Sequence, residues 1–274
     1  MSPNRKKAKT IAEITIPLII VVFLVSVTLY SGIWPPVSTV ASESMTHSDY
    51  WDPGTLNVGD IVFVKKVDNL PGPVITYVIG RETGYSTYGE YGNVILYKNP
   101  SGETIIHRAI FYLYWNGSTP EVQGYHGQSW IIINDSYVII MDMGYAHRNL
   151  FVNLKGMQGH NGFITAGDYN LAVAAAPIKF NSTLTVYEAA DQNIGITNLP
   201  VSKNIVGIAF WDIPWFGLIK LNILRLYGKW PEYNEVAKDS YDLLGATTFL
   251  ILLAVFFPYS RVLGGKKKRK KGSR

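Results

Sequence analysis

Apolar and polar positions alternate along the middle of the chain. Stretches rich in β-branched and aromatic residues are separated by clusters of Gly, Asn and Pro, a pattern typical of β-strands joined by turns. Little of this region has the period of a helix. We predict strands over Ile61–Lys65, Pro73–Val78, Val94–Tyr97, Thr104–Tyr114, Ser129–Met143, Leu184–Tyr187 and Ile205–Trp211. The predicted fold class is therefore mainly β, with an all-β domain over residues 35–241.

Two uncharged apolar runs flank this region. Ile14–Trp34 and Leu243–Ser260 are each long enough to cross a bilayer core as a helix. The first run could instead be a cleaved signal peptide, and the second could be a buried core helix. We expect transmembrane helices over 14–34 and 243–260, with a basic N-terminus (1–13) before the first and a basic tail (261–274) after the second.

The net charge of +5 comes from the two ends of the chain. Four basic residues lie in Arg5–Lys9 and seven in Lys266–Arg274, and the rest has 14 Lys and Arg against 20 Asp and Glu. Because each basic cluster flanks an apolar run, the pattern disfavours nucleic-acid binding and favours a membrane anchor. The positive-inside bias then predicts a multi-pass protein of the cell membrane, with both termini cytoplasmic and the β domain on the external face.

The chain has no cysteine, which excludes disulfides, a thiol nucleophile and zinc sites built on cysteine. None of its five histidines begins a His-Glu-x-x-His motif, so a metalloprotease is unsupported. We expect no metal and no organic cofactor.

Two interpretations stay open for residues 214–230, where large apolar groups and tryptophans alternate with three cations. The segment could lie in a membrane interface, or it could be an amphipathic element packed on the β domain.

The candidate chemistry rests on one serine and one histidine. Ser44 lies on the irregular connection before the predicted strand at Ile61. His107 lies on the return strand of a predicted hairpin with its turn at Asn99–Gly102. A serine hydroxyl is a weak nucleophile that needs a base within hydrogen-bond reach, together with donors aimed at the developing oxyanion. His107 is the candidate base.

An ordered set of motifs surrounds these two residues: Ser42-Glu43-Ser44-Met45, Gly59-Asp60 with an apolar run, Ile106-His107-Arg108, Ile164-Thr165-Ala166-Gly167-Asp168-Tyr169-Asn170, and Ile205–Gly217. In this order they resemble type I signal peptidases. Histidine stands where the bacterial branch has lysine, so the chain resembles the archaeal and endoplasmic-reticulum branch.

The resemblance implies a signal-peptidase-like β domain and a membrane-bound serine endopeptidase that removes N-terminal signal peptides from exported preproteins. It implies attack by Ser44 with His107 as general base. It also implies an oxyanion site made by the Ser44 N–H and the Ser42 hydroxyl, with Met45 packed beneath. The partners expected are secretory preproteins with small residues at the first and third positions before the cut, the lipid bilayer and the protein translocation channel.

The acid is where the chain departs from the family. A second aspartate usually follows the Gly-Asp box within a few residues, but here Asn170 leads into an apolar run, and the next carboxylates are Glu188 and Asp191. We interpret Phe163–Asn193 as the family box with an insertion. Asp191 is then the expected partner of His107, and Asp168 a structural acid nearby.

A second departure is His47, which replaces a proline common in the family and predicts a remodelled loop at the edge of the site. The rival hypothesis is a non-catalytic, membrane-tethered β domain that acts as a binding or assembly subunit. A peptidase for other substrates, such as pilin-like precursors, is a further alternative.

Overall fold

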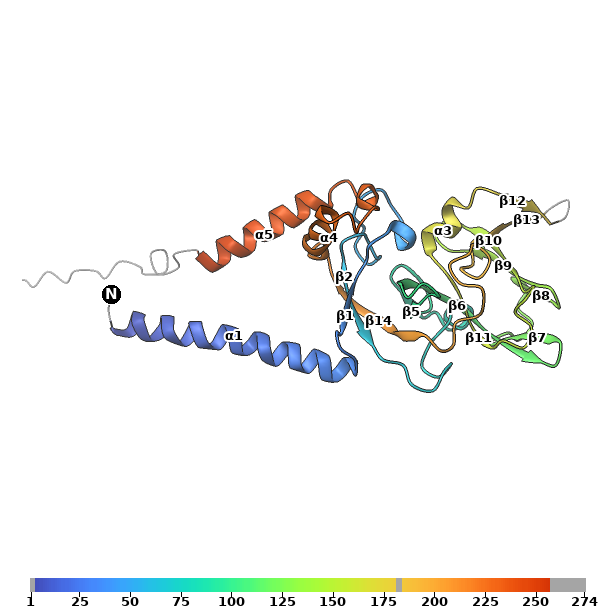
Figure 1. Ribbon diagram of the computed structural model, residues 1–274, viewed down its shortest axis with the longest axis horizontal. Helices are drawn as coiled ribbons and strands as arrows, with labels where there is room; N and C mark the ends of the chain where they lie inside the picture. Colours follow the sequence, from blue (N-terminus) through green and yellow to red (C-terminus); the bar gives the residue numbers. More distant parts are fainter. Residues whose placement is uncertain (1–2, 181–183, 257–274) are drawn as a thin grey trace, which may run out of the picture.

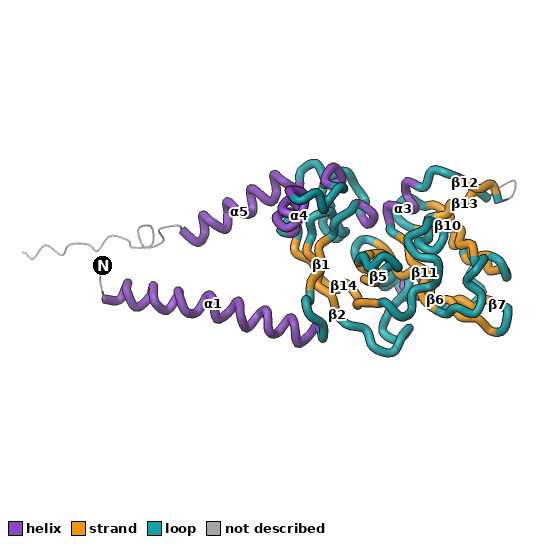
Figure 2. Tube along the Cα trace, viewed as in Figure 1, coloured by secondary structure: helices purple, strands orange, loops and turns teal. Residues whose placement is uncertain are grey.

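The computed structural model describes residues 3–180 and 184–256, and Figure 1 shows their arrangement. In this part of the chain the protein is mainly β, with several sheets and five α-helices. Figure 2 shows strands gathered in the body and two helices that project from it in the same direction.

The larger sheet has seven strands. Their order is β1 (Val37–Thr39), β2 (Ile61–Lys65), β14 (Ile205–Ile213), β5 (Val94–Lys98), β6 (Thr104–Asn116) and β11 (Gly162–Ala166), and β7 (Thr119–Val122) also pairs with β6. Neighbouring strands in this sheet pair antiparallel. Strand β14, near the end of the chain, therefore lies between two strands from its first half.

The second sheet has five strands in the order β12 (Pro177–Lys179), β13 (Thr185–Glu188), β10 (Arg148–Asn153), β9 (Tyr137–Met143) and β8 (Ile131–Asn134). Strands β10 and β13 run parallel, whereas the other neighbours are antiparallel. A short hairpin of β3 (Ser86–Thr87) and β4 (Glu90–Tyr91) completes the strands.

One apolar core joins the two large sheets. Ile110, Phe111 and Leu113 of β6 pack in the same cluster as Ile140 of β9 and Leu150 of β10. The clustered side chains named here are fully buried, so the sheets share a single apolar interior and support each other.

The helices are α1 (Pro3–Ser31), α2 (Tyr77–Thr83), α3 (Asp168–Val173), α4 (Gly217–Leu226) and α5 (Ser240–Phe256). Two 3₁₀ turns lie in connections: η1 (Glu43–Met45) between β1 and β2, and η2 (Tyr233–Glu235) between α4 and α5. Helix α4 occupies most of the 214–230 segment and buries Leu218 and Leu221 against the body, while Ile219 and Ile223 stay exposed.

The predicted strand over Pro73–Val78 is wrong, because α2 begins there. The side chain of Thr76 accepts a hydrogen bond from the Ile79 N–H, and Gly84 ends the helix in the left-handed region. The capping hydroxyl and the terminal glycine are local signals that outweigh the β-branched residues of this stretch.

The C-terminal segment fastens the chain around Ser44. Trp230 Nε1 donates to Ala41 O at 2.8 Å, and the Glu43 N–H donates to Glu235 Oε2 at 2.9 Å. The Trp51 N–H donates to Asp239 Oδ1 at 2.7 Å. Residues 41–51 are therefore held by residues 230–239.

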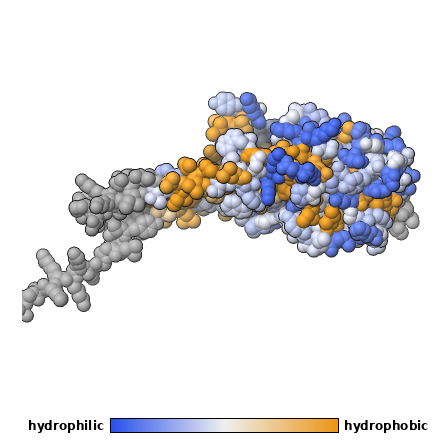
Figure 3. All heavy atoms as spheres, turned by 90° about the horizontal axis from the view of Figure 1, so that it is seen from below, coloured by the Kyte–Doolittle hydropathy of each residue, from blue (hydrophilic) through white to orange (hydrophobic). Residues whose placement is uncertain are grey.

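Helices α1 and α5 carry the two predicted membrane spans. Helix α1 ends at Ser31, before the predicted end at Trp34, since Gly32 takes a φ of 66° and two prolines follow. Helix α5 begins at Ser240 and runs to Phe256, the last residue that the structure describes. Both helices expose apolar side chains, which gather on the projecting end in Figure 3.

Within residues 3–180 and 184–256, no helix combines the length and apolar character that a membrane crossing requires. The predicted spans over 14–34 and 243–260 are therefore wrong, and so is the placement in a cell membrane with an external catalytic domain. Residues 257–260 of the second predicted span and the predicted tail, 261–274, lie outside the described residues.

Candidate active site

Ser44 lies in the middle of the η1 turn, directly after the first edge strand of the larger sheet. Met45 is 1 % exposed and packs in the core with Val62 and Val64. This packing anchors the turn to the larger sheet. The Thr46 N–H and hydroxyl both donate to Glu43 O at 2.9 Å and close the turn. The half-buried Ser44 side chain lies 3.4 Å from Ser42, Oγ to Oγ.

His107 lies on β6, opposite Ile95 of β5, and is 3 % exposed. Its Nδ1 lies 2.8 Å from both carboxylate oxygens of Asp191. An ionised carboxylate only accepts hydrogen bonds, so Nδ1 donates, which leaves Nε2 of a neutral ring as an acceptor. This is the tautomer that a general base requires.

Asp191 is fully buried just beyond β13. Its N–H donates to Thr165 O at 2.8 Å, and its carbonyl accepts from the Ile196 and Thr197 N–H groups. The carboxylate therefore belongs to a turn that is attached to β11, close to His107.

Tyr97, which none of the sequence motifs marks, completes the environment of the carboxylate. Its hydroxyl donates to Asp191 Oδ2 at 2.6 Å. Burial, together with the negative charge of Asp191, raises the pKa of Tyr97, so the phenol keeps its proton. The pairing of β5 with β6 contained a signal for Tyr97. Tyr97 lies opposite Ile105, which is two residues from His107 on β6, so Tyr97 and His107 face the same side of the sheet.

Gly167 lies between Ser44 and His107. A Cβ built on Gly167 would lie 2.5 Å from Ser44 O and 3.0 Å from His107 Nε2. Ser44 and His107 are therefore neighbours across this glycine. The side chains of Ser44 and His107 form no hydrogen bond with each other in the structure as described; catalytic hydrogen bonds often tighten only when substrate binds.

Asp168 contacts Arg108 and His47, while Asp191 is the carboxylate at His107. Arg108 Nε and Nη2 donate to the two Asp168 oxygens at 2.8 and 2.7 Å, and both side chains are almost fully buried. Burial alone would raise the pKa of Asp168, but the charge and hydrogen bonds of Arg108 outweigh it and, with His47, lower the pKa below its usual value. Asp168 is an ionised carboxylate in a buried ion pair.

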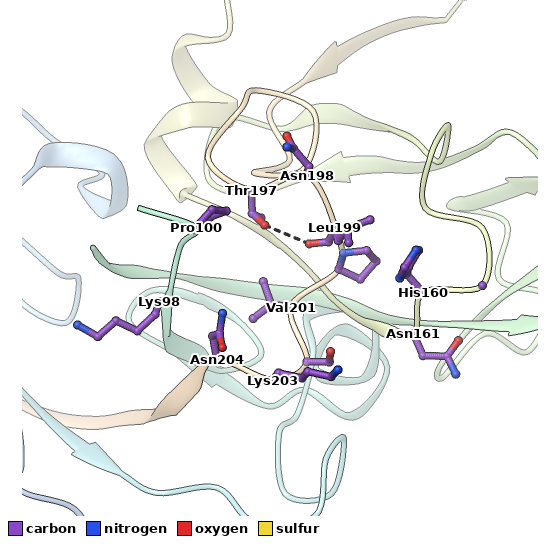
Figure 4. Close-up of a pocket in the computed structure, with 13 residues that line it drawn as sticks. Lys98, Pro100, His160, Asn161, Thr197, Asn198, Leu199, Val201, Lys203 and Asn204 are labelled. Atoms are coloured by element: carbon purple, nitrogen blue, oxygen red, sulfur yellow. Dashed lines mark hydrogen bonds between the residues drawn. The ribbon is translucent and has the colours of Figure 1, made fainter. Parts of the chain in front are cut away.

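A cavity lies elsewhere in the fold. It measures about 710 Å³, and Figure 4 shows Lys98, His160 and Lys203 at its border, around the connection that leads into β14. These three side chains are exposed, and Ser44, His107 and Asp191 are not part of the lining. The buried His107–Asp191 pair is the better candidate, because a histidine that is oriented by a carboxylate and lies beside a serine has the geometry of a base next to a nucleophile.

Among the residues that the structure describes, no group of three His, Asp or Glu side chains could hold a metal ion. The remaining histidines, His126, His147 and His160, are all exposed. His147, for example, is exposed and pairs with Asp142 at 2.9 Å.

No known family model matches the chain, and no curated protein matches its sequence significantly.

Proposed function

We propose that the protein is a serine endopeptidase of the type I signal peptidase kind, with a Ser-His mechanism, that removes N-terminal signal peptides from preproteins. The observation that carries the proposal is the buried His107–Asp191 pair, whose ring nitrogen Nε2 lies beside the turn of Ser44. The ordered motifs from Ser42 to Gly217 supply the family resemblance and the substrate class.

In the proposed reaction, Ser44 Oγ attacks the carbonyl carbon of the scissile bond, and His107 Nε2 takes the hydroxyl proton. The C–N bond then breaks, and the leaving amine takes the proton from His107. Water, deprotonated by the same nitrogen, attacks the acyl ester and restores Ser44. Asp191 holds Nδ1 and stabilises the imidazolium that forms in each step.

Negative charge develops on the carbonyl oxygen in both steps. The Ser42 hydroxyl, 3.4 Å from Ser44 Oγ, is the proposed side-chain donor to that oxygen, together with the Ser44 N–H. A single donor of this kind contributes about 3–4 kcal/mol to the transition state in other serine enzymes.

Free strand edges near the site support binding of an extended peptide. Residues Thr104–His107 of β6 pair with β5 along one edge of the strand. Along the opposite edge, β6 begins to pair with β11 only at Arg108. In the described part of the chain β1 pairs only with β2. An extended peptide can add to such edges through its main chain.

The test is cleavage of a synthetic preprotein by the purified protein and by Ser44→Ala. We expect the wild-type chain to cut once after the signal peptide and Ser44→Ala to cut at background rate while it melts at the same temperature. Ser101→Ala is the matched control, because Ser101 is exposed in the turn of the hairpin that carries His107. Cleavage by Ser44→Ala at the wild-type rate would refute the serine mechanism, and an inactive wild-type protein would favour the binding-subunit alternative.

A further inference from the structure

His47 is a second histidine at the site, and the proposed mechanism does not use it. It follows Ser44 by three residues, its side chain is 8 % exposed, and its Nε2 lies 3.0 Å from Asp168 Oδ2. Because Asp168 is an ionised carboxylate and can only accept, Nε2 carries a proton and donates. The chain just after the nucleophile is therefore bonded to a buried acid.

That acid belongs to a rigid assembly. Arg108, which holds both oxygens of Asp168, is fully buried and follows His107 on β6. The same guanidinium donates to the main-chain carbonyls of Thr87, Tyr88, Glu90, Tyr91 and Gly92. A planar, multiply bonded guanidinium of this kind has little freedom to shift. His47 is thus tied, through Asp168 and Arg108, to the strand position adjacent to the base.

The imidazole ring of His47 is also packed on one face and at one edge. It stacks on Tyr145, from the turn between β9 and β10, with ring centroids 4.3 Å apart and an angle of 26°. A Cβ built on Gly89 would lie 2.9 Å from His47 Cε1, so the β3–β4 turn packs directly against the ring. Stacking fixes the plane of the ring, and the hydrogen bond to Asp168 fixes its rotation.

The Ser44 turn is held by hydrogen bonds on both sides, and the nearest ones to other elements come from Glu43 and His47. Before Ser44, the Glu43 N–H is bonded to Glu235, and after Ser44 the polar tie is His47 to Asp168. We propose that His47 is a positioning residue, which sets Ser44 relative to His107 by its hydrogen bond to the Asp168–Arg108 pair. This inference rests on the proposed function, and a misplacement of about 1 Å can lower a catalytic rate by about 100-fold.

Two substitutions separate the hydrogen bond from the packing. His47→Phe keeps a ring to stack on Tyr145 but has no donor, whereas His47→Gln keeps an N–H donor at the reach of Nε2. We expect His47→Phe to lower kcat by about 10- to 100-fold with little change in KM. His47→Gln should recover at least half of the wild-type kcat. His126→Gln, at an exposed histidine, is the control and should leave kcat unchanged.

A second readout does not need cleavage. Hydrogen exchange of the amides of residues 43–47 should be faster in His47→Phe than in the wild-type protein and should return to the wild-type rate in His47→Gln. The nitrogen chemical shifts of the His47 ring in the wild-type protein, where no variant has to fold, should show a proton on Nε2.

The outcomes discriminate between the two proposals. If the wild-type protein cleaves no preprotein but exchange at 43–47 depends on the donor at His47, the proposed function fails and the structural tie stands. If His47→Phe retains at least half of the wild-type kcat, or if His47→Gln and His47→Phe lose equal amounts, the positioning role is refuted. A proton on Nδ1 instead of Nε2 would also refute it.

Discussion

The two aspartates of the candidate site differ in the charge that each of them faces. Asp191 meets the Nδ1 of His107, whose ring becomes positively charged in the proposed mechanism when it takes the serine proton, whereas Asp168 meets the permanent charge of Arg108. A carboxylate of the first kind acts mainly in the transition state, and one of the second kind acts mainly in folding.

We therefore expect opposite effects when each aspartate is changed to asparagine. Asp191→Asn should lower kcat by on the order of 10⁴-fold with little change in KM, because the amide favours the wrong tautomer of His107. Asp168→Asn should chiefly lower stability, by roughly 3–5 kcal/mol, because it leaves Arg108 buried without a countercharge. Steady-state kinetics and urea unfolding of both variants check this. A folded but inactive Asp168→Asn beside a fully active Asp191→Asn would reverse the assignment.

Tyr97 provides a graded test of the same environment. Tyr97→Phe keeps the ring in the core but removes the donor at 2.6 Å from Asp191. We expect a loss of about 1.5–3 kcal/mol of stability, the usual value of a hydrogen bond to a charged group, and a fall in kcat smaller than that of Asp191→Asn. Unchanged stability and kcat in Tyr97→Phe would mean that Asp191 does not depend on this hydroxyl.

At the scale of the elements, local pattern predicted some strands and missed others. The predicted Ile61–Lys65 has the bounds of β2, and β13 lies one residue beyond its predicted range, because β-branched residues between turn signals mark both. Strand β11 was not predicted as a strand: its five residues are all buried, so they show no alternation of polar and apolar positions.

The candidate site could not be predicted from the local pattern that marks the strands. Asp191 is predicted from the family box with an insertion over Phe163–Asn193, and in the structure it contacts His107; its catalytic role stays a prediction. The bond from His47 to Asp168 joins residues 121 positions apart. No local pattern specifies a contact of this kind, because it depends on how α3 and η1 pack.

Asp60 links the start of β2 to the start of α4. Its Oδ2 accepts from the Asn57 N–H at 2.8 Å, and its Oδ1 accepts from the Trp215 N–H at 3.1 Å. Burial raises the pKa of Asp60 to about 7, against the lowering effect of these hydrogen bonds. At neutral pH this junction therefore holds a carboxyl group in the middle of its titration.

The raised pKa predicts a pH dependence with a definite sign. The folded state binds the Asp60 proton more tightly than the unfolded state. The protonated Asp60 therefore contributes in full to the free energy of unfolding below about pH 3.8, and this contribution is lost as pH rises through about 7. Three pKa units correspond to about 4 kcal/mol. The unfolding free energy of the wild-type protein minus that of Asp60→Asn should therefore fall by about that amount between pH 4 and pH 8 in urea titrations. Parallel pH curves for the two proteins would contradict this.

At the scale of the whole molecule, the shared core predicts that the two large sheets unfold together. Phe111 of β6 is fully buried in the cluster that also contains Ile140 and Leu150 of the other sheet. Phe111→Ala should lower stability by about 3–5 kcal/mol and leave a single transition. Tryptophan fluorescence and far-ultraviolet circular dichroism should report the same midpoint. Two separate transitions in the wild-type protein would show that the sheets are independent domains.

The fastening of residues 41–51 by residues 230–239 has a consequence during synthesis. The bond from Trp51 to Asp239 spans 188 positions, so the ribosome adds that many residues before the contact can form. At about 5–20 residues per second, this takes roughly 10–40 s. The turn that bears Ser44 is therefore synthesised early but is fixed in place only when almost all of the chain has been translated.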